Sequence, residues 1–424
     1  MPASNRSTLV AATVLDQIDA IEARFKAREP DVRAFVPEEG RFDRLRREAR
    51  DLLDRFPRLD ARPPLFGVLV GAKDIFHVDG FVTRAGSRLP PQALQGAEAA
   101  SVTLLKGAGA LIVGKTVTTE FAYFAPGPTR NPRDLAHTPG GSSSGSAAAV
   151  AAGLCALALG TQTIGSISRP AAFCGVVGYK PSYDRISRGG VIPLSPSLDH
   201  VGTFTPNVAG AIRAASVLSR DWRFENAERR PVLGIPEGPY LSNATQEGLA
   251  HFRSACQRLA TAGYSVKPVA TMPDFEAIRE RHNLILAAEA ARVHAGWFAR
   301  HADVYHPKTA DLIRRGQAVP DGELALALAG RERLRAELTA LMDAHGVDLW
   351  IAPSAPGPAP RGLDSTGDPV MNLPWTHSGL PTLSLPAGKT DAGLPLGLQL
   401  AGRWYADEAL LSWAIQIERV LQRG

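Results

Sequence analysis

Cysteine is scarce in this chain of 424 residues, which contains only Cys155, Cys174 and Cys256. Three cysteines form no network of disulfide bonds, and none stands in a CxxC pair, so a disulfide-stapled scaffold and a thiol redox motif are excluded. This usage is typical of a reducing compartment, and we expect a cytoplasmic protein. Cys174 stands in the apolar run AAFCGVVG, where we expect a small buried residue and not a nucleophile.

Long hydrophobic runs are also absent. The most apolar run, Ala147–Gly160, contains 14 residues and is too short to cross a bilayer. The opening MPASNRSTLVAATVLDQIDA lacks the basic-then-apolar order of a signal peptide. We therefore expect no membrane-spanning segment and no membrane partner.

An excess of one charge sign is missing too, because 47 basic and 42 acidic residues leave a net charge of +5. The densest basic run, Arg41–Arg50, is interrupted by acids, and we expect it to be a solvated helix face. We expect no nucleic-acid partner. The sequence contains no HExxH motif and no Cys/His cluster, so we expect neither a metal nor an organic cofactor.

Hydrophobic residues make up 45% of the chain, enough for a large buried core. Between residues 65 and 235, short apolar runs alternate with helices of small residues, which predicts an α/β fold whose sheet is covered by helices on both faces. The predicted strands of this region are Leu65–Ala72, Ala110–Lys115, Cys155–Gly160 and Val232–Ile235. The predicted helices are Glu98–Lys106, Ser144–Ala152 and Asn207–Leu218.

We expect a single domain over residues 1–424, because strands return after the helical region that follows residue 242. The proline-rich segment 353–374 is then a loop over the sheet edge and not a linker. Asn243, with Gln246 three residues on, is expected to cap a helix. The expected parts are N-terminal helices at 7–28 and 41–56, a catalytic core at 65–235, a helical insertion at 242–346, and C-terminal strands with a helix at 348–424. The N-terminal helices are expected to wrap the core or to meet a second copy in a homodimer.

The most unusual segment is Thr138–Ala152, with the sequence TPGGSSSGSAAAVAA. A flexible linker would not run directly into an apolar helix within an α/β pattern. A phosphate-binding loop would need the lysine of GxxxxGK[ST], which is missing. Gly141, Ser143 and Gly145 fit GxSxG, but the residues before them suit a loop and not the strand that such a nucleophile elbow requires.

Two further segments carry candidate chemistry. Ser166 lies in a small-residue turn after a predicted strand, where backbone N–H groups are able to converge on an oxyanion. Lys73 ends the first apolar strand, where it either reaches solvent, pairs with Asp74, or is buried. Burial would disfavour its ammonium form, and a neutral lysine is a competent general base near neutral pH.

Together these segments, with the flanks GGSSSGSAAAVAAG and PAAFCGVVGYKP, resemble the amidase signature family of serine hydrolases. The resemblance covers 65–205 strongly and 350–402 more weakly. It implies a mixed central sheet and a Ser–cis-Ser–Lys triad formed by Ser166, Ser142 and Lys73. It also implies a cis peptide before Ser142, an acyl-enzyme on Ser166, and no cofactor. The implied oxyanion-hole residues are Thr163, Ile164, Gly165 and Ser166.

Around the nucleophile this chain departs from the common family pattern D-T-G-G-S-I-R. Gln162 replaces the acid, Ile164 replaces a glycine, and Arg169 lies three residues after Ser166 instead of two. The spacing of Arg169 resembles the malonamidase branch, in which a matching arginine binds a substrate carboxylate, with Ser143 and Gln162 as further candidate substrate ligands. A structural ion pair is the other interpretation of Arg169. If the turn needs a positive φ, Ile164 would be strained; otherwise it narrows the acyl pocket or weakens activity.

The sequence therefore predicts an amidase that acts on a small-molecule amide, with a monoamide of a dicarboxylic acid such as malonamate as the first candidate. Aryl amides, carbamates and carboxylated ureas are alternatives. A glutaminase-like subunit of a tRNA-dependent amidotransferase is a different class, against which the short chain argues. A binding module that retains only the scaffold is a third class. Asp199 and His200 suggest a charge pair that stabilises a loop.

Overall fold

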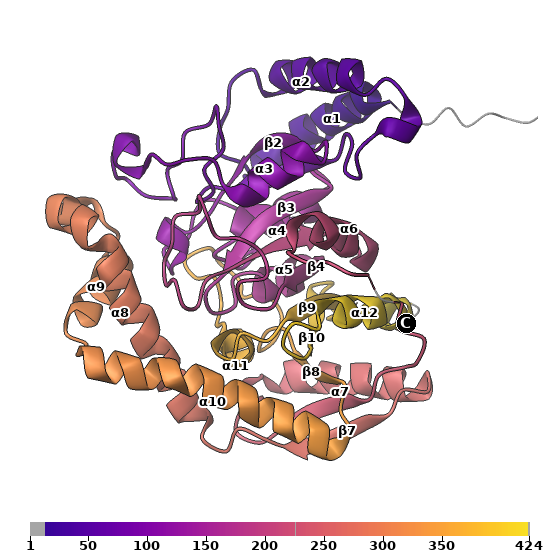
Figure 1. The fold of residues 1–424 in the computed structure, drawn as a ribbon, viewed down its shortest axis with the longest axis vertical. Coiled ribbons are helices and arrows are strands. Elements are labelled where there is room, and N and C mark those ends of the chain that lie inside the picture. The colour runs from indigo at the N-terminus through magenta and orange to yellow at the C-terminus, as the bar shows by residue number, and fades with distance from the viewer. Residues whose placement is uncertain (1–12, 225, 423–424) are drawn as a thin grey trace, which may run out of the picture.

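The computed structural model describes residues 13–224 and 226–422 (Figure 1). Ten strands form one sheet in the order β2-β1-β3-β5-β4-β9-β10-β8-β6-β7. The strands are β1 Leu69–Lys73, β2 Leu111–Thr116, β3 Leu157–Gln162, β4 Val177–Lys180, β5 His200–Thr205, β6 Leu233–Glu237, β7 Val266–Ala270, β8 Leu349–Pro353, β9 Thr382–Lys389 and β10 Pro395–Ala401. The α-helices are α1 Val14–Val32, α2 Arg41–Arg55, α3 Ala100–Gly107, α4 Ser144–Ala151, α5 Ser168–Cys174, α6 Val208–Leu218, α7 Gln246–Thr261, α8 Phe275–His301, α9 Pro307–Gln317, α10 Asp321–His345, α11 Leu373–His377 and α12 Asp407–Gln422.

The sheet is mixed, as the family resemblance implies. Strand β1 lies parallel to β2 and β3, and β6 lies parallel to β7 and β8. The strands between these groups run antiparallel from β3 through β5, β4, β9 and β10 to β8. The carboxyl ends of β1 and β3 therefore meet at one edge, which brings Lys73 close to Thr161.

Helices cover both faces of the sheet, which confirms the expected α/β architecture. On β4, Val177 and Tyr179 belong to a core that also contains Phe252 of α7 and Leu410 of α12. Gly178 between them faces α5, so closely that an added Cβ would lie 2.6 Å from the Cβ of Ala171. Neighbouring residues of one strand are thus buried under different helices. None of the described helices is long and apolar enough to pass through a membrane.

The N-terminal helices α1 and α2 pack together beside the edge strand β2 (Figure 1). They therefore wrap the core, and residues 7–12 of the predicted helix 7–28 lie outside the described residues. The expectation of a solvated helix face at 41–50 holds only in part, because Arg47 and Arg50 are exposed but other arginines of the run are not. Arg41 is only 6% exposed, and Arg44 donates hydrogen bonds to the carbonyl oxygens of Ile112 and Val113.

The region 242–346 contains more than the predicted helices. Strand β7 pairs with β6 as the last strand of the sheet, before α8, α9 and α10 extend away from it (Figure 1). The predicted cap is also wrong by two residues, because the side chain of Thr245, not of Asn243, accepts the N–H of Gly248. A strand with the sequence VKPVA, most of whose residues are at least partly solvated, carries little apolar signal.

Candidate active site

Lys73 is buried at the end of β1, where strands on both sides shield it from solvent. Its Nζ donates to Oγ of Ser142 at 2.7 Å and to Oγ1 of Thr161 at 2.8 Å. The side chain is fully buried, so it neither reaches solvent nor pairs with Asp74, which instead forms an ion pair with Lys115. Two hydroxyl groups are thus its hydrogen-bond partners.

Burial lowers the pKa of Lys73 well below its usual value, while the negative charge of Asp199 opposes the shift. Desolvation disfavours the ammonium form because the low dielectric interior gives the charge less stabilisation than water. In its neutral form the amine has a lone pair, which is able to accept a proton from a neighbouring hydroxyl group. The position of Lys73 and the direction of its pKa shift are thus compatible with a base that acts on Ser142.

The glycine- and serine-rich segment before α4 is ordered and buried, which excludes a flexible linker. At Gly145 an added Cβ would lie 2.2 Å from the carbonyl oxygen of Ala34 and 2.3 Å from the backbone nitrogen of Val117. Only glycine allows this close approach of three backbone segments. The peptide between Gly141 and Ser142 is cis.

The turn from Thr163 to Ser166 presents free backbone donors. None of its four N–H groups donates a hydrogen bond to an acceptor within the described part of the chain. The carbonyl oxygens of Ile164 and Gly165 are held by Oγ1 of Thr376 at 2.6 Å and by the N–H of Arg169 at 3.0 Å. Since buried backbone donors are nearly always paired, this set of unpaired N–H groups suits an anionic ligand.

Ile164 fits the turn without strain, because its φ is not among the positive values of the chain. Its side chain is 7% exposed and lines the cavity that contains Ser142 and Ser166. Of the alternatives for this residue, the structure excludes a strained positive φ and places the side chain in the cavity wall. Glycine is instead required at Gly165, where an added Cβ would lie 2.3 Å from Oδ1 of Asn372.

Ser142 and Ser166 line one cavity, which is nearly closed at about 10 Å³. Their hydroxyl groups form no hydrogen bond with each other in the part of the chain that the structure describes. Oγ of Ser142 instead accepts a hydrogen bond from Nζ of Lys73. A second cavity of about 370 Å³ shares Tyr123, Phe124 and Ile164 with the first. The first cavity is too small for a substrate as it stands. The shared residues form a wall between the two serines and the 370 Å³ cavity, which we call the outer chamber.

Arg169 is 1% exposed and lines the serine cavity. Its Nη2 donates to the carbonyl oxygen of Gly141 at 2.7 Å and to Oγ1 of Thr366 at 3.1 Å. Its Nε and Nη1 are buried without a partner, and no carboxylate of the described residues forms an ion pair with it. Burial lowers its pKa to about 10, while Asp368 opposes the shift. A structural ion pair is therefore excluded within this part of the chain, and the two free donors suit a bound anion.

Ser143 and Gln162 do not line the serine cavity. Oγ of Ser143 bonds the backbone of Thr161. Oε1 of Gln162 accepts the N–H groups of Ile167 and Ser168 at 2.8 and 2.9 Å, and Nε2 donates to Thr376. With their polar atoms engaged in this way, both side chains position the turn around Ser166 and have no donor or acceptor directed at a substrate.

Asp199 has a role that the sequence did not reveal. Its Oδ1 accepts the hydroxyl of Thr163 at 2.6 Å, and its Oδ2 accepts the N–H groups of Leu194 and Ser195. Burial raises its pKa to about 6. No charge pair with His200 forms, because Nδ1 of His200 lies 2.7 Å from the carbonyl oxygen of Leu198. The contact that reveals the role of Asp199 is with Thr163, 36 residues earlier in the chain, and no local sequence pattern indicates it.

Cys174 is buried, as predicted, and its thiol contacts the carbonyl oxygen of Pro139 at 3.4 Å. Burial raises the pKa of the thiol to about 12, so it is inert at neutral pH. In the described residues, no group of three or more His, Cys, Asp or Glu side chains is arranged to hold a metal ion.

Comparison with known proteins identifies the family. The profile described as Amidase matches residues 17–411. The chain is 33% identical to a glutamyl-tRNA(Gln) amidotransferase subunit of Synechococcus sp. (strain RCC307), covering 96% of this chain and 94% of that protein. A crystal structure of an amidase superposes with a TM-score of 0.87 at 34% identity, over 96% of both chains. Native peptide amidase from Stenotrophomonas maltophilia superposes with a TM-score of 0.80 at 26% identity, over 97% of this chain and 94% of that one. The chain therefore belongs to the amidase family and is an enzyme that hydrolyses amide C–N bonds.

Proposed function

We propose that the enzyme hydrolyses a small amide through a triad formed by Ser166, Ser142 and Lys73. The observation that carries this proposal is the 2.7 Å contact between the buried amine of Lys73 and Oγ of Ser142, which lines one cavity together with Ser166. The free N–H groups of Thr163–Ser166 support the same reaction, because a tetrahedral intermediate develops negative charge beside them.

In the acylation step, Oγ of Ser166 attacks the amide carbon. Ser142 accepts the proton of Ser166 and passes its own proton to Nζ of Lys73. The unpaired N–H groups of Thr163–Ser166 bind the oxyanion, and each such donor lowers the barrier by about 3 kcal/mol. The proton then returns through Ser142 to the leaving nitrogen, because an amine departs readily only when protonated.

In the deacylation step, a water molecule attacks the ester carbonyl of acylated Ser166. The same lysine and bridging serine accept its proton and return one to Oγ of Ser166. The products are a carboxylate and ammonia. In apo structures catalytic hydrogen bonds are often loose, so the missing bond between Ser142 and Ser166 is expected to form when the substrate orients the two hydroxyl groups.

Arg169 supports a substrate that carries a carboxylate. It offers two buried, unpartnered nitrogen donors in the wall of the serine cavity, and a planar guanidinium pairs a carboxylate in a bidentate manner. In a short dicarboxylic monoamide such as malonamate, one methylene group separates the carboxylate from the amide, which suits Arg169 and Ser166 in the wall of the same cavity. Aryl amides, carbamates and carboxylated ureas are the competing substrates.

The test is ammonia release from malonamate and from malonamide, which has nearly the same size but no charge. We expect malonamate to be preferred, and Arg169→Ala to lower its kcat/KM by at least about tenfold with little change for malonamide. Arg133→Ala is the matched control, since Arg133 also donates to backbone carbonyl oxygens but lies outside the cavity. Equal losses on both substrates would contradict the carboxylate assignment and leave the triad standing.

A second candidate is the glutaminase-like subunit of a tRNA-dependent amidotransferase. The Synechococcus relative from such an enzyme is 33% identical, and this chain covers 94% of its length, so the length of the chain does not argue against the role. Purification with partner chains and tRNA, and glutaminase activity that depends on them, would favour this function. Activity of the isolated chain on free malonamate would favour the first.

A further inference from the structure

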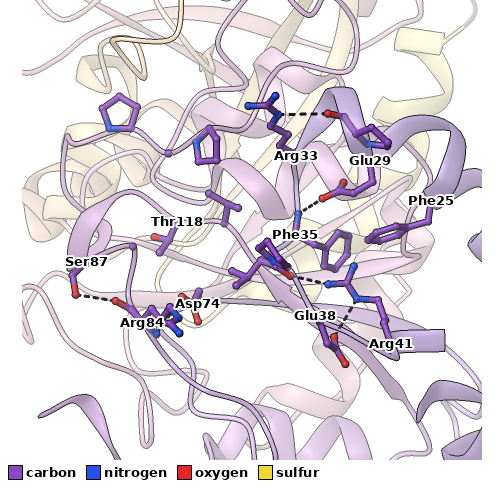
Figure 2. A pocket seen from close by; sticks show the side chains of 18 of the residues that line it. Phe25, Glu29, Arg33, Phe35, Glu38, Arg41, Asp74, Arg84, Ser87 and Thr118 are labelled. Carbon is purple, nitrogen blue, oxygen red and sulfur yellow. Dashed lines mark hydrogen bonds and ion pairs between the residues drawn. The ribbon is translucent and has the colours of Figure 1, made fainter. Parts of the chain in front are cut away.

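A separate cavity of about 760 Å³ lies near the N-terminal helices (Figure 2). The end of α1, residues 33–38, the start of α2, the loop after β1 and residues 117–128 form its walls. None of its lining residues belongs to the serine cavity. A volume of this size accommodates a small organic ligand.

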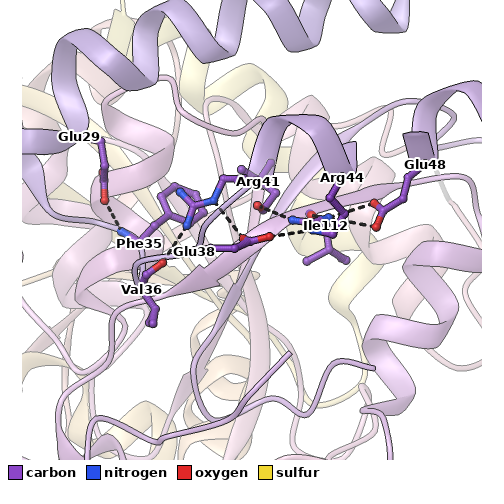
Figure 3. Close-up of polar contacts among 9 residues, drawn as sticks. Glu29, Phe35, Val36, Glu38, Arg41, Arg44, Glu48 and Ile112 are labelled. Atoms are coloured by element: carbon purple, nitrogen blue, oxygen red, sulfur yellow. Dashed lines mark hydrogen bonds and ion pairs between the residues drawn. The ribbon is translucent and has the colours of Figure 1, made fainter. Parts of the chain in front are cut away.

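One wall of this cavity is aromatic and carries a buried cation. The rings of Phe25 and Phe35 lie 5.2 Å apart, and the guanidinium of Arg41 lies 4.5 and 5.0 Å from their centres. Arg41 donates from Nε to Glu38 at 3.1 Å and from Nη2 to the carbonyl oxygen of Val36 at 2.7 Å (Figure 3). Its Nη1 has no hydrogen-bond partner among the described residues, although the side chain is only 6% exposed.

The backbone is shaped to receive this arginine. An added Cβ at Gly114, in the middle of β2, would lie 3.1 Å from Oε2 of Glu38 and 3.3 Å from Nε of Arg41. A larger residue at position 114 would come too close to the ion pair between Arg41 and Glu38. Glycine weakens a strand interior, so its position here indicates that the Arg41–Glu38 pair needs the space.

The acids of the cavity are already satisfied by the protein. Both oxygens of Glu29 accept backbone N–H groups, at 3.1 Å from Ala34 and 2.7 Å from Phe35. Glu38 bonds Arg41 and also Arg44 (Figure 3). A further acid, Asp74, forms the buried ion pair with a lysine of β2. Glu38 and Asp74 are thus each paired with a cation, whereas the backbone N–H groups that bond Glu29 do not cancel the charge of its carboxylate.

Two solvent-exposed arginines also line the cavity, and one of them, Arg84, lies close enough to Asp74 for their charges to interact. Arg33 and Arg84 line opposite sides of the cavity in Figure 2, and neither forms an ion pair with a carboxylate of the described residues. Within the same part of the chain, the only hydrogen bond that the side chain of Arg33 donates is a long one of 3.5 Å to the carbonyl oxygen of Pro30. With Nη1 of Arg41, the cavity thus offers three guanidinium groups beside an apolar wall.

We infer that this cavity is a second, non-catalytic site for a small organic anion with a flat apolar body, such as an arene carboxylate. Arg33, Arg84 and Arg41 bind the anionic groups, and the ring packs beside Phe25. The site adjoins the proposed triad, because Asp74 follows Lys73 directly and the carbonyl oxygen of Val117 accepts the N–H of Gly145 at 2.9 Å. The proposal does not depend on the substrate of the serine cavity.

The test is isothermal titration of the full chain with isophthalate, whose two carboxylates match cations on two sides. We expect binding to the wild type to weaken with added salt, and Arg33→Gln/Arg84→Gln to weaken it by at least about tenfold. Arg47→Gln/Arg50→Gln is the matched control, because it removes the same charge from residues of α2 outside the cavity. Arg169→Ala shows whether isophthalate binds in the serine cavity instead, because Arg169 lines that cavity and not this one.

Binding that is lost in the Arg33/Arg84 variant and kept in the other two supports the proposal. Absence of binding to the wild type at about 10 mM isophthalate overturns it. An equal loss in the α2 control overturns it too, since general charge attraction would then explain the effect. A loss confined to Arg169→Ala assigns the ligand to the serine cavity and also overturns the second site.

Discussion

Nζ of Lys73 lies 2.7 Å from Oγ of Ser142, although the two residues are 69 positions apart in the chain. Strand β1 delivers the lysine, and the glycine-rich loop before α4 delivers the serine. Burial lowers the pKa of Lys73 well below its usual value and so favours the neutral amine that a base requires. A surface lysine at the same distance would remain an ammonium group at neutral pH.

The triad is expected to act as a unit. Lys73→Met and Ser142→Ala should each lower kcat by about 10²–10⁴-fold, because each interrupts the same path of proton transfer. The double variant should then be no slower than the slower single variant. Steady-state ammonia release measures all three. Multiplicative losses would show that the two residues act independently, contrary to the account.

The charge of Asp199 is expected to set the acid limb of the pH profile. This charge raises the pKa of Lys73, so Asp199→Asn should lower that pKa further and move the acid limb of kcat/KM to lower pH. The comparison is made above about pH 6, where the carboxyl of Asp199 is ionised. Thr163→Val is the control, since it removes the hydrogen bond to Asp199 and keeps the charge. If the acid limb moves equally in both variants, the shift comes from the lost hydrogen bond between Thr163 and Asp199 and not from the charge of Asp199.

Ile164→Gly is expected to widen the range of acyl groups that the enzyme accepts. The side chain lines both the serine cavity and the outer chamber, so its removal takes away part of the wall between them. Losing such a contact changes discrimination by about 1–3 kcal/mol, or about 10- to 200-fold in relative kcat/KM. Rates on amides of increasing acyl length provide the measurement. Identical rate ratios along the series would refute a role in selectivity.

Gly145→Ala is expected to destabilise the fold by about 2 kcal/mol or more. The new methyl group would meet the backbone of Ala34 and Val117, which has no side-chain freedom to move away. Gly296→Ala is the matched control, because this exposed position in α8 has open space around it and alanine favours a helix. Urea denaturation should show a large loss for the first and none for the second. A stable Gly145→Ala protein would disprove the close backbone approach.

The sequence predicted the elements with regular apolar patterns and missed those without them. The strand Leu111–Thr116 and the helix Val208–Leu218 agree with prediction within about one residue. Strand His200–Thr205 was missed, because its burial depends on pairing with β3 and β4 and not on an apolar run. Strand Val266–Ala270 was missed because Pro268 and solvated neighbours suit an edge strand that has little hydrophobic signal.

Site residues that belong to family motifs were predictable from the sequence. Side chains whose contacts are made by residues distant in the chain were not. Gln162 was predicted to bind substrate, but backbone N–H groups five and six residues on occupy its oxygen. The run Arg41–Arg50 was predicted to be a solvated helix face, but carbonyl oxygens 68 and 69 residues away accept N–H groups of Arg44. Tertiary contacts determine the environment of such side chains, and the local periodicity of the sequence carries no information about these contacts.

The most direct test is the pH dependence of covalent labelling of Ser166 by a fluorophosphonate, followed by mass spectrometry in the wild type and in Lys73→Met. We expect one label per chain on Ser166, at a rate that rises with pH through a midpoint well below the usual pKa of lysine, and almost no labelling in the variant. Equal labelling of both proteins, or labelling at another residue, would contradict the proposed base and nucleophile.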